Sequence, residues 1–329
     1  PQRGTYVTTH RYQDQFISLG AAVLNELHPR GILFYDKRMK KLLVTGGGGF
    51  LGWNLVQTAG RDWEVYATVH SRRIELDGAT VEKVDLTDYR ALKEMFSSIK
   101  PDAMIHTAAA SQPNYCQEHR SESQKINVDA ALNIAGLCAD RGIALAFCST
   151  DLVFDGTRSP YRESDPVSPV SYYAEQKVEA EKGIMERYPR AAVSRMPLMF
   201  GDPGPVATSF IQPFLKSMRA GQELRLFMDE FRTPVSGRVA SQGLLLALAK
   251  VNGLIHLGGR ERISRHDFGL MLASRLEIVS ADIKPCRQKD VPMAAPRPPD
   301  VALDSARAYA LGYDPPSLVD QIMELKGRI

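Results

Sequence analysis

The stretch VTGGGGFLG, from Val44 to Gly52, places five glycines in nine residues at the end of an apolar segment. Gly46, Gly49 and Gly52 stand three residues apart. In a strand–turn–helix unit, the first such glycine permits the tight turn, the second lets the backbone approach a pyrophosphate, and the third lets helix and strand pack closely. The N–H groups at the helix start favour negative charge. The loop therefore predicts a dinucleotide site, and a glycine-rich turn without a ligand is the alternative.

Apolar strands and amphipathic helices alternate around this loop. Strands are expected at 40–46, 64–70, 81–86, 102–109, 143–150 and 191–201. Helices are expected at 50–60, 88–99, 121–142 and 171–188. This alternation predicts the α/β class, with a doubly wound parallel (Rossmann) sheet covered on both faces. Ligands of such sheets bind beyond the carboxyl ends of the strands.

The alternation divides the chain into three parts. Residues 39–201 are predicted to form the dinucleotide-binding domain. Beyond residue 201 the pattern loosens and prolines cluster, so 202–329 is predicted to be a smaller α/β region that mainly binds substrate. Residues 1–38 are an extension of unknown role, because Met39 directly precedes the first strand and is a natural start.

The composition limits the kinds of partner that the protein could bind. The 329 residues are 44% hydrophobic and carry a net charge of +3, with basic and acidic residues interleaved. This balance favours neither nucleic acid nor a membrane surface. The sequence has no run of the roughly 18 apolar residues that a membrane span needs. The four cysteines show no metal-ligand spacing, so we expect free thiols, no metal and a cytoplasmic protein.

The end of the second strand indicates which dinucleotide binds. An acidic residue there would bind the ribose hydroxyls of NAD, but the sequence reads TVHSRR, with His70 followed by Arg72 and Arg73. Such arginines suit the extra phosphate of NADP(H), although they could also be solvated loop residues, which leaves NAD(H) open. Asp85, after the third strand, is placed to meet the adenine amino group.

Hydroxyl and amine side chains follow the fifth strand. Thr150 ends that strand, and Tyr173 and Lys177 stand four residues apart on one face of the next helix. An ammonium beside a tyrosine should lower the pKa of the phenol and fit it for proton transfer to a carbonyl oxygen. A chance pair on a solvated helix is the alternative. The preceding dinucleotide loop favours the catalytic interpretation.

Together these motifs resemble the extended short-chain dehydrogenase/reductase family over Met39 to the C-terminus. TGGGGFLG is similar to its TGxxGFxG loop, and HTAAA to its fourth-strand segment. STDLVFDG and PYRESDPVSPVSYYAEQK resemble more narrowly the dTDP-4-dehydrorhamnose reductase subgroup. The resemblance implies a catalytic triad of Thr150, Tyr173 and Lys177, and substrate contacts from Thr150 and Asp151, to which Arg232 is added as a candidate. With the glycine loop and the strand ends, the predicted coenzyme contacts are Gly46, Gly49, Phe50, Leu51, Gly52, His70, Arg72, Arg73, Asp85, Leu86, Ala108, Ala109, Ala110, Tyr173 and Lys177.

Some positions depart from the family pattern. Gln176 stands where the family often has serine or threonine, and SRMPLMFG replaces a stretch that usually contains tryptophan. The second departure leaves the sugar undefined. His106 and His256 lie in apolar segments and are expected to be satisfied core histidines. Arg232 and Arg297 could bind a diphosphate or form surface salt bridges.

The sequence thus predicts an NADPH-dependent reductase of a ketone on a nucleotide-linked 4-keto-6-deoxy sugar, with a homodimer left open. A sugar-nucleotide epimerase or dehydratase of the same family is one alternative. A non-catalytic NADP-binding regulatory subunit, resembling that of methionine adenosyltransferase, is another.

Overall fold

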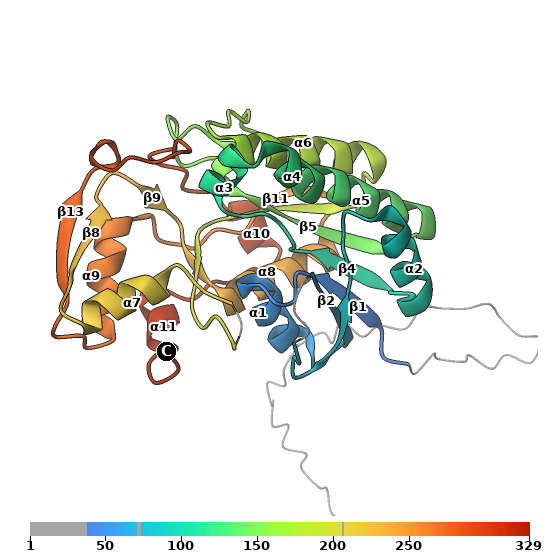
Figure 1. The fold of residues 1–329 in the computed structure, drawn as a ribbon, viewed down its shortest axis with the longest axis horizontal. Coiled ribbons are helices and arrows are strands. Elements are labelled where there is room, and N and C mark those ends of the chain that lie inside the picture. The colour runs from blue at the N-terminus through green and yellow to red at the C-terminus, as the bar shows by residue number, and fades with distance from the viewer. Residues whose placement is uncertain (1–37, 71–73, 206) are drawn as a thin grey trace, which may run out of the picture. The chain divides into compact units, whose positions relative to one another are not determined.

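A seven-stranded parallel sheet organises the described residues of this computed structural model, which are 38–70, 74–205 and 207–329 (Figure 1). The order across the sheet is β11-β6-β5-β4-β1-β2-β3. Its strands are β1 (Lys41–Thr45), β2 (Glu64–Val69), β3 (Ala79–Lys83), β4 (Ala103–His106), β5 (Ala144–Thr150), β6 (Ala192–Met196) and β11 (Gly253–His256). The predicted α/β doubly wound sheet is confirmed, since the order reverses between β1 and β4, where a crevice opens at the carboxyl ends of the strands.

Helices cover both faces of this sheet. They are α1 (Phe50–Ala59), α2 (Tyr89–Ile99), α3 (Pro113–Glu118), α4 (Arg120–Gln124), α5 (Ala130–Arg141), α6 (Tyr172–Arg187) and α8 (Gly237–Lys250). Figure 1 shows α5 and α6 above the sheet and α1 and α8 below it. Alternate residues of one strand face the two layers: Leu42 and Val44 pack with Leu55 and Leu244, while Leu43 packs with Ile134. All six side chains are fully buried, so each face of the sheet closes its own apolar core.

The glycine loop adopts the backbone that its sequence predicts. Gly46 has φ +73°, in the left-handed region that other residues rarely adopt. A Cβ on Gly52 would lie 2.1 Å from the Gly46 carbonyl oxygen, a distance that no real contact allows. The turn out of β1 and the close packing of α1 therefore both depend on glycine.

The long helix expected at 121–142 is interrupted. A π-helical turn, η1 (Lys125–Asp129), separates α4 from α5, and Gly142 closes α5 with φ +66°. The Asn127 side chain in this turn bonds both the N–H and the carbonyl of Ala110, and its amide also donates to Gln176 Oε1. The turn therefore holds the segment after β4 against α6.

The chain beyond residue 201 contributes to two layers. Its β11 joins the central sheet and its α8 packs against that sheet, whereas a second group packs separately around Phe200, Phe268 and Leu318. This group contains α7 (Ile211–Arg219), α9 (Arg265–Arg275), α11 (Leu318–Met323), β8 (Glu223–Phe227) and β13 (Asp282–Cys286). Short strands β7 (Met199–Phe200), β9 (Phe231–Arg232), β10 (Val235–Ser236) and β12 (Ile263–Ser264) and helix α10 (Ala306–Ala310) link the two layers.

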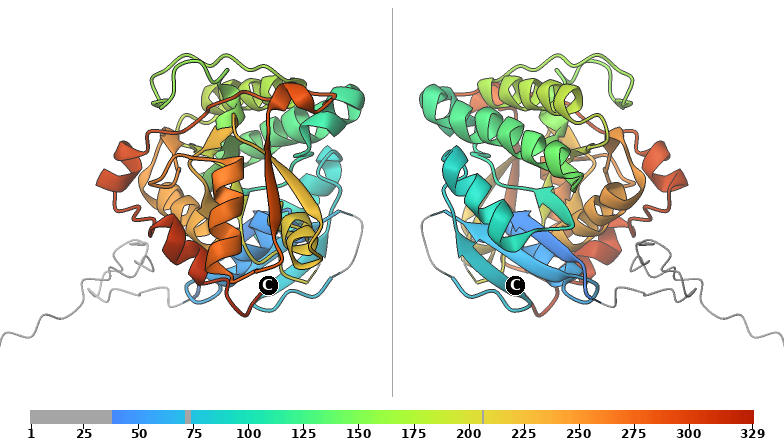
Figure 2. Two further views of the ribbon diagram at one scale, coloured as in Figure 1. Left: turned by 90° about the vertical axis from the view of Figure 1, so that its left-hand side faces the viewer. Right: turned by 90° about the vertical axis from the view of Figure 1, so that its right-hand side faces the viewer.

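Figure 2 views this second group from its own side, where β8 and β13 run parallel beside α9. The chain from Lys40 to Ile329 forms one compact unit. The division at residue 201 therefore marks a change of sequence pattern, and the assignment of 202–329 mainly to substrate stays a prediction. The predicted extension, 1–38, lies outside the described residues except for Arg38.

Candidate functional site

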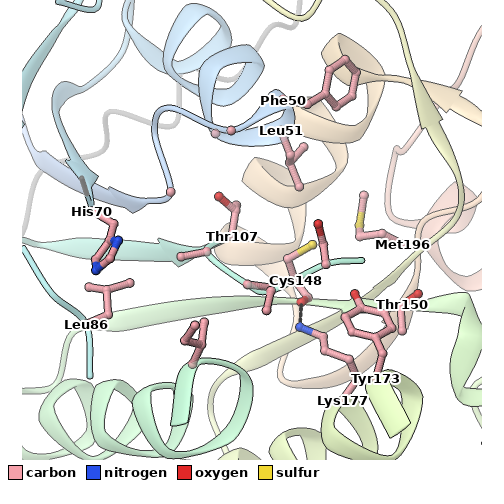
Figure 3. A pocket seen from close by; sticks show the side chains of 18 of the residues that line it. Phe50, Leu51, His70, Leu86, Thr107, Cys148, Thr150, Tyr173, Lys177 and Met196 are labelled. Carbon is pink, nitrogen blue, oxygen red and sulfur yellow. Dashed lines mark hydrogen bonds between the residues drawn. The ribbon is translucent and has the colours of Figure 1, made fainter. Parts of the chain in front are cut away.

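A cavity of about 830 Å³ lies at the carboxyl ends of the central strands, where the doubly wound fold predicts a ligand (Figure 3). The glycine loop and the ends of β2 and β4 line one part of it. The end of β5, helix α6 and the segment after β6 line the other. The cavity thus spans both the predicted dinucleotide loop and the predicted catalytic residues.

Nearly all predicted coenzyme residues line this one cavity. They are Gly46, Gly49, Phe50, Leu51, Gly52, His70, Asp85, Leu86, Ala108, Ala109, Ala110, Tyr173 and Lys177. Arg72 and Arg73 lie outside the described residues. The structure therefore brings together segments that the sequence separates by more than a hundred residues, although their contacts with a coenzyme remain predictions.

The start of α1 suits an anion. Gly49 is the N-cap residue of α1, and its N-terminal N–H groups receive no side-chain cap. A helix start of this kind presents unpaired N–H donors and the positive end of its dipole. Because Gly46 and Gly52 also lack side chains where a Cβ would collide with backbone, the loop forms a cradle that fits a pyrophosphate.

The Asp85 carboxylate is already engaged within its own turn. Its Oδ1 accepts hydrogen bonds from Thr87 N at 2.9 Å and from Thr87 Oγ1 at 2.7 Å. These bonds lower the pKa of Asp85 below its ordinary value, so it is ionised at neutral pH. An ionised acceptor at this edge of the cavity fits the predicted contact with an adenine amino group.

Tyr173, Lys177 and Thr150 lie together in the inner part of the cavity (Figure 3). Ser171 caps α6 by accepting from Ala174 N, and this sets the start of the helix that carries Tyr173 and Lys177. The Lys177 ammonium donates to the carbonyl of Cys148 at 2.6 Å and lies 4.1 Å from the centre of the Phe147 ring. The neighbouring Tyr172 instead bonds Gln124 at 3.3 Å, so Tyr173 is the tyrosine of this site.

Burial dominates the electrostatics of the pair. Burial raises the pKa of Tyr173, and the Cys148 and Cys116 thiols act in the same direction. Burial likewise lowers the pKa of Lys177. The expectation that Lys177 lowers the pKa of the phenol is therefore wrong for this arrangement, in which the ammonium is directed to the Cys148 carbonyl. Tyr173 is a protonated acid here.

Of the predicted substrate residues, Thr150 lines the cavity, whereas Asp151, the next residue, and Arg232 do not line it and instead bind each other. Arg232 Nε is 3.6 Å from Asp151 Oδ2, and Arg232 Nη2 is 3.5 Å from Glu230 Oε1. Glu230 also accepts from Arg265 at 2.5 Å. Since Asp151, Arg232 and Glu230 are each 4% exposed, this is a buried ion cluster and not a surface salt bridge.

Asp151 is the poorly compensated member of that cluster. Burial raises the pKa of Asp151 to about 6, and Arg232 only partly opposes it. Its Oδ2 has no hydrogen-bond partner. Burial also acts to raise the pKa of Glu230, but Arg265 and Arg232 hold it below its ordinary value. Arg297, partly buried nearby, donates to Asn114 and to the Ala295 carbonyl.

Several cavity residues have no counterpart in the sequence-based prediction. Met196 to Met199 and Thr208 to Phe210 form the wall beyond Tyr173, and Lys125 of the π-helical turn joins the coenzyme side. Cys148 also lines the cavity. In the sequence, Gly201 indicates a loop after β6. Nothing in the local pattern indicates which side chains of that loop face the cavity.

The two histidines are buried in different ways. His256 bonds the Tyr161 carbonyl through Nδ1 at 3.1 Å and is a core residue as expected. His106 bonds Thr45 Oγ1 at 2.7 Å, yet its Nε2 has no partner, so it is only half satisfied. In the described part of the chain, no group of three or more His, Cys, Asp or Glu side chains could hold a metal ion. The same residues contain no helix with the length and apolar character to cross a membrane.

The family of the chain follows from comparison with known proteins. The model of the RmlD substrate binding domain matches residues 39–325. The chain belongs to this family. Membership confirms the resemblance to the dTDP-4-dehydrorhamnose reductase subgroup that the sequence motifs carry.

Named relatives fall into two kinds. Methionine adenosyltransferase 2 subunit beta of Bos taurus is 27% identical over 282 residues, covering 83% of each chain. The probable low-salt glycan biosynthesis reductase Agl14 of Haloferax volcanii is 29% identical over 292 residues, covering 86% of this chain and 96% of its own. The family member described here is therefore similar both to a reductase and to a subunit of another enzyme.

A solved structure shares the fold. The dTDP-4-dehydrorhamnose reductase of Bacillus anthracis, solved in complex with NADP, superposes with a TM-score of 0.78 at 19% identity. The match covers 88% of this chain and 99% of that one. The central sheet and the second group of helices and strands thus recur together in this reductase.

Proposed function

We propose that this protein is an NADP(H)-dependent oxidoreductase that reduces a ketone on a nucleotide-linked 4-keto-6-deoxy sugar. The observation that carries the proposal is the single cavity that joins the glycine cradle to Thr150, Tyr173 and Lys177. Similarity to the reductases Agl14 and dTDP-4-dehydrorhamnose reductase supports the same class.

The coenzyme side is built for a dinucleotide. The α1 N–H groups and the Gly46–Gly52 cradle would hold the pyrophosphate, and Asp85 would accept from the adenine. Arg72 and Arg73 would hold the extra phosphate of NADP. When bound, the nicotinamide supplies the hydride, because that chemistry belongs to the coenzyme.

The catalytic side is built for proton donation. Because the pKa of Tyr173 is raised, the phenol holds the proton that a ketone oxygen must gain as it becomes a hydroxyl. Thr150 stands beside Tyr173 and would orient the same oxygen once its hydroxyl turns from Asp151 Oδ1, 3.2 Å away. Lys177 would hold the nicotinamide ribose, replacing or sharing its bond to the Cys148 carbonyl.

The substrate side carries charge for a diphosphate. Arg232 and Arg265 balance Asp151 and Glu230 in the buried cluster, and the partly buried Arg297 nearby adds a third guanidinium, so the formal charge of these five groups is positive when both acids are ionised. One guanidinium group can bind two phosphate oxygens at once. A nucleotide diphosphate would therefore compete with Asp151 and Glu230 for these arginines, which makes this charge the basis for the nucleotide-sugar assignment.

The test is oxidation of NADPH, and separately of NADH, with dTDP-4-dehydrorhamnose as substrate. Oxidation that requires Tyr173, with Tyr173→Phe as the control, supports the reductase. Lack of oxidation by a protein that still binds NADPH contradicts this substrate.

Similarity to methionine adenosyltransferase 2 subunit beta favours a second candidate, a regulatory subunit that binds NADP without turnover. Co-elution with a methionine adenosyltransferase catalytic subunit on size-exclusion chromatography, dependent on NADPH, would support it. Separate elution under all coenzyme conditions would exclude it.

A further inference from the structure

A row of polar side chains crosses the apolar sheet just below the site. Ser149 of β5 is in register with Arg195 of β6, which is in register with His256 of β11. The three residues are 3%, 3% and 0% exposed. Such groups are costly to bury unless they are paired, so the row requires a partner from the layer above.

Glu181 of α6 is that partner. Its Oε1 accepts from Ser149 Oγ at 2.5 Å and from Arg195 Nε at 3.0 Å. Its Oε2 accepts from Arg195 Nη2 at 2.8 Å, which completes a two-pronged ion pair. The carboxylate, 2% exposed, therefore fixes α6 to two adjacent strands at once.

The same helix is fixed again one turn earlier. Lys177 precedes Glu181 by four residues and donates to the carbonyl of Cys148, the residue before Ser149 (Figure 3). Two consecutive residues of β5, Cys148 and Ser149, thus bind side chains from two consecutive turns of α6. Thr150 follows directly, so the height of α6 against β5 decides how Thr150 and Tyr173 meet.

The charge around Lys177 also depends on Glu181. Burial lowers the pKa of Lys177, while Glu181 and the Cys148 and Cys116 thiols oppose that effect. Burial raises the pKa of each of these thiols, so they are neutral at neutral pH. His106 also interacts with Lys177, but burial lowers its pKa to about 3, so it is uncharged. Of these surrounding groups, the Glu181 carboxylate carries the compensating charge.

We propose that Glu181 is a positioning residue that holds α6 in register with β5 and β6 and places a fixed negative charge one helical turn from Lys177. As a role in catalysis, this inference rests on the proposed function. As a statement about Lys177, it holds for the protein without coenzyme.

The decisive variant is Glu181→Gln, which keeps the side-chain shape and removes the charge. It also leaves Arg195 unpaired, and both changes disfavour the Lys177 ammonium. We expect the apparent pKa of Lys177 to fall by at least about one unit. The readout is a pH titration of ¹³Cε-labelled lysine by NMR in the coenzyme-free protein, with the Lys177 resonance assigned by its loss in Lys177→Arg.

A matched control is Glu175→Gln, the same chemical change on the same helix at an exposed position. It should leave the Lys177 titration unchanged. If Glu181→Gln does not fold, the double variant Glu181→Gln/Arg195→Met, which removes both charges, replaces it. In the double variant the apparent pKa of Lys177 should fall by less than in Glu181→Gln, because the loss of the Arg195 charge partly offsets the loss of the carboxylate.

The outcomes separate the two proposals. An unchanged Lys177 titration in a folded variant overturns the assignment of Glu181. A lowered pKa, with the alkaline limb of NADPH turnover moved to lower pH by the same amount, supports it. A lowered pKa in a protein whose parent form never turns over substrate supports the charge assignment and contradicts the proposed function.

Discussion

The glycine loop that lines the cavity and the charge cluster beside it differ in how they are built, and we propose that they form the coenzyme end and the substrate end of the site. At the coenzyme end, the surface of the cradle is formed by the backbone. Glycines, strand ends and the N–H groups of α1 shape it, and the glycines and these N–H groups come from one stretch of chain. On the side that we propose for the substrate, side chains from the segment after β5, from β9 and from α9 meet, and Asp151, Arg232 and Arg265 belong to one cluster of charges. In this account the coenzyme side is preformed, whereas a substrate would have to displace existing ion pairs on the other side.

The largest expected effect lies where the two ends meet. Tyr173→Phe removes the proton that the ketone oxygen must gain, and should lower turnover about 1000-fold. The affinity for NADPH should stay unchanged, since the glycine cradle is untouched. Steady-state kinetics and calorimetric titration with NADPH measure the two quantities. Equal losses in both would show that Tyr173 holds the fold of the site instead of donating a proton.

At the coenzyme end, one methyl group added to the glycine loop should destabilise the fold. In Gly52→Ala the added Cβ would overlap the Gly46 carbonyl, so the free energy of unfolding should fall by about 3 kcal/mol. Denaturant unfolding measures it. Gly136→Ala is the matched control, because its Cβ would meet only an Arg187 side-chain atom at 3.6 Å. That variant should gain up to about 1 kcal/mol in helix α5.

At the substrate end, Asp151 should make the free energy of unfolding depend on pH. The pKa of Asp151 rises from 3.8 to about 6 on folding, so its stabilising contribution is full below pH 4 and is lost as pH rises through 6. Asparagine cannot ionise, so Asp151→Asn does not lose this stability as the pH rises. Relative to the wild type, its free energy of unfolding should increase by about 3 kcal/mol between pH 4 and pH 7.

Asp155 provides a control of opposite sign. Hydrogen bonds from Thr157 and Tyr161 lower its pKa to about 2, so its contribution is present above pH 4 and is lost on acidification. Asp155→Asn should therefore be least stable relative to the wild type at neutral pH. Urea unfolding of the three proteins across this range measures both slopes. Parallel curves for all three would contradict the assigned charges.

The smallest expected effect concerns coenzyme choice. Replacing Arg72 and Arg73 with alanine should weaken NADPH binding about 10-fold, the value of one charge-assisted hydrogen bond, and leave NADH binding unchanged. Fluorescence titration with each coenzyme measures the ratio. Arg90→Ala, at an exposed position of α2, should alter neither affinity. Equal weakening of both coenzymes would remove the basis for NADP preference.

The coenzyme end could be predicted from sequence because its signals are local. The glycine spacing predicted the turn at Gly46, and the helical period predicted a helix at 88–99, where α2 lies. Each of these features depends on residues within a few positions of one another. The six predicted strands accordingly occur close to their expected places.

Other features depend on contacts that no local pattern contains. The four-residue strand β11 joins the sheet beside β6 only because α8 brings it there, and the sequence did not predict it. The π-helical turn at Lys125–Asp129 was hidden in a continuous helical pattern. The raised pKa of Tyr173 follows from its burial, and the Asp151–Arg232 pair joins segments 81 positions apart. Spacing in sequence reports none of these.

The most direct test follows a deuterium atom. NADPH deuterated at both C4 positions is incubated with dTDP-4-dehydrorhamnose, and the product is analysed by mass spectrometry. The account predicts one deuterium on the reduced carbon, and no such product with Tyr173→Phe. A product formed without deuterium would contradict hydride transfer from exchangeable NADPH, and would identify an isomerising enzyme that returns hydride to its own substrate.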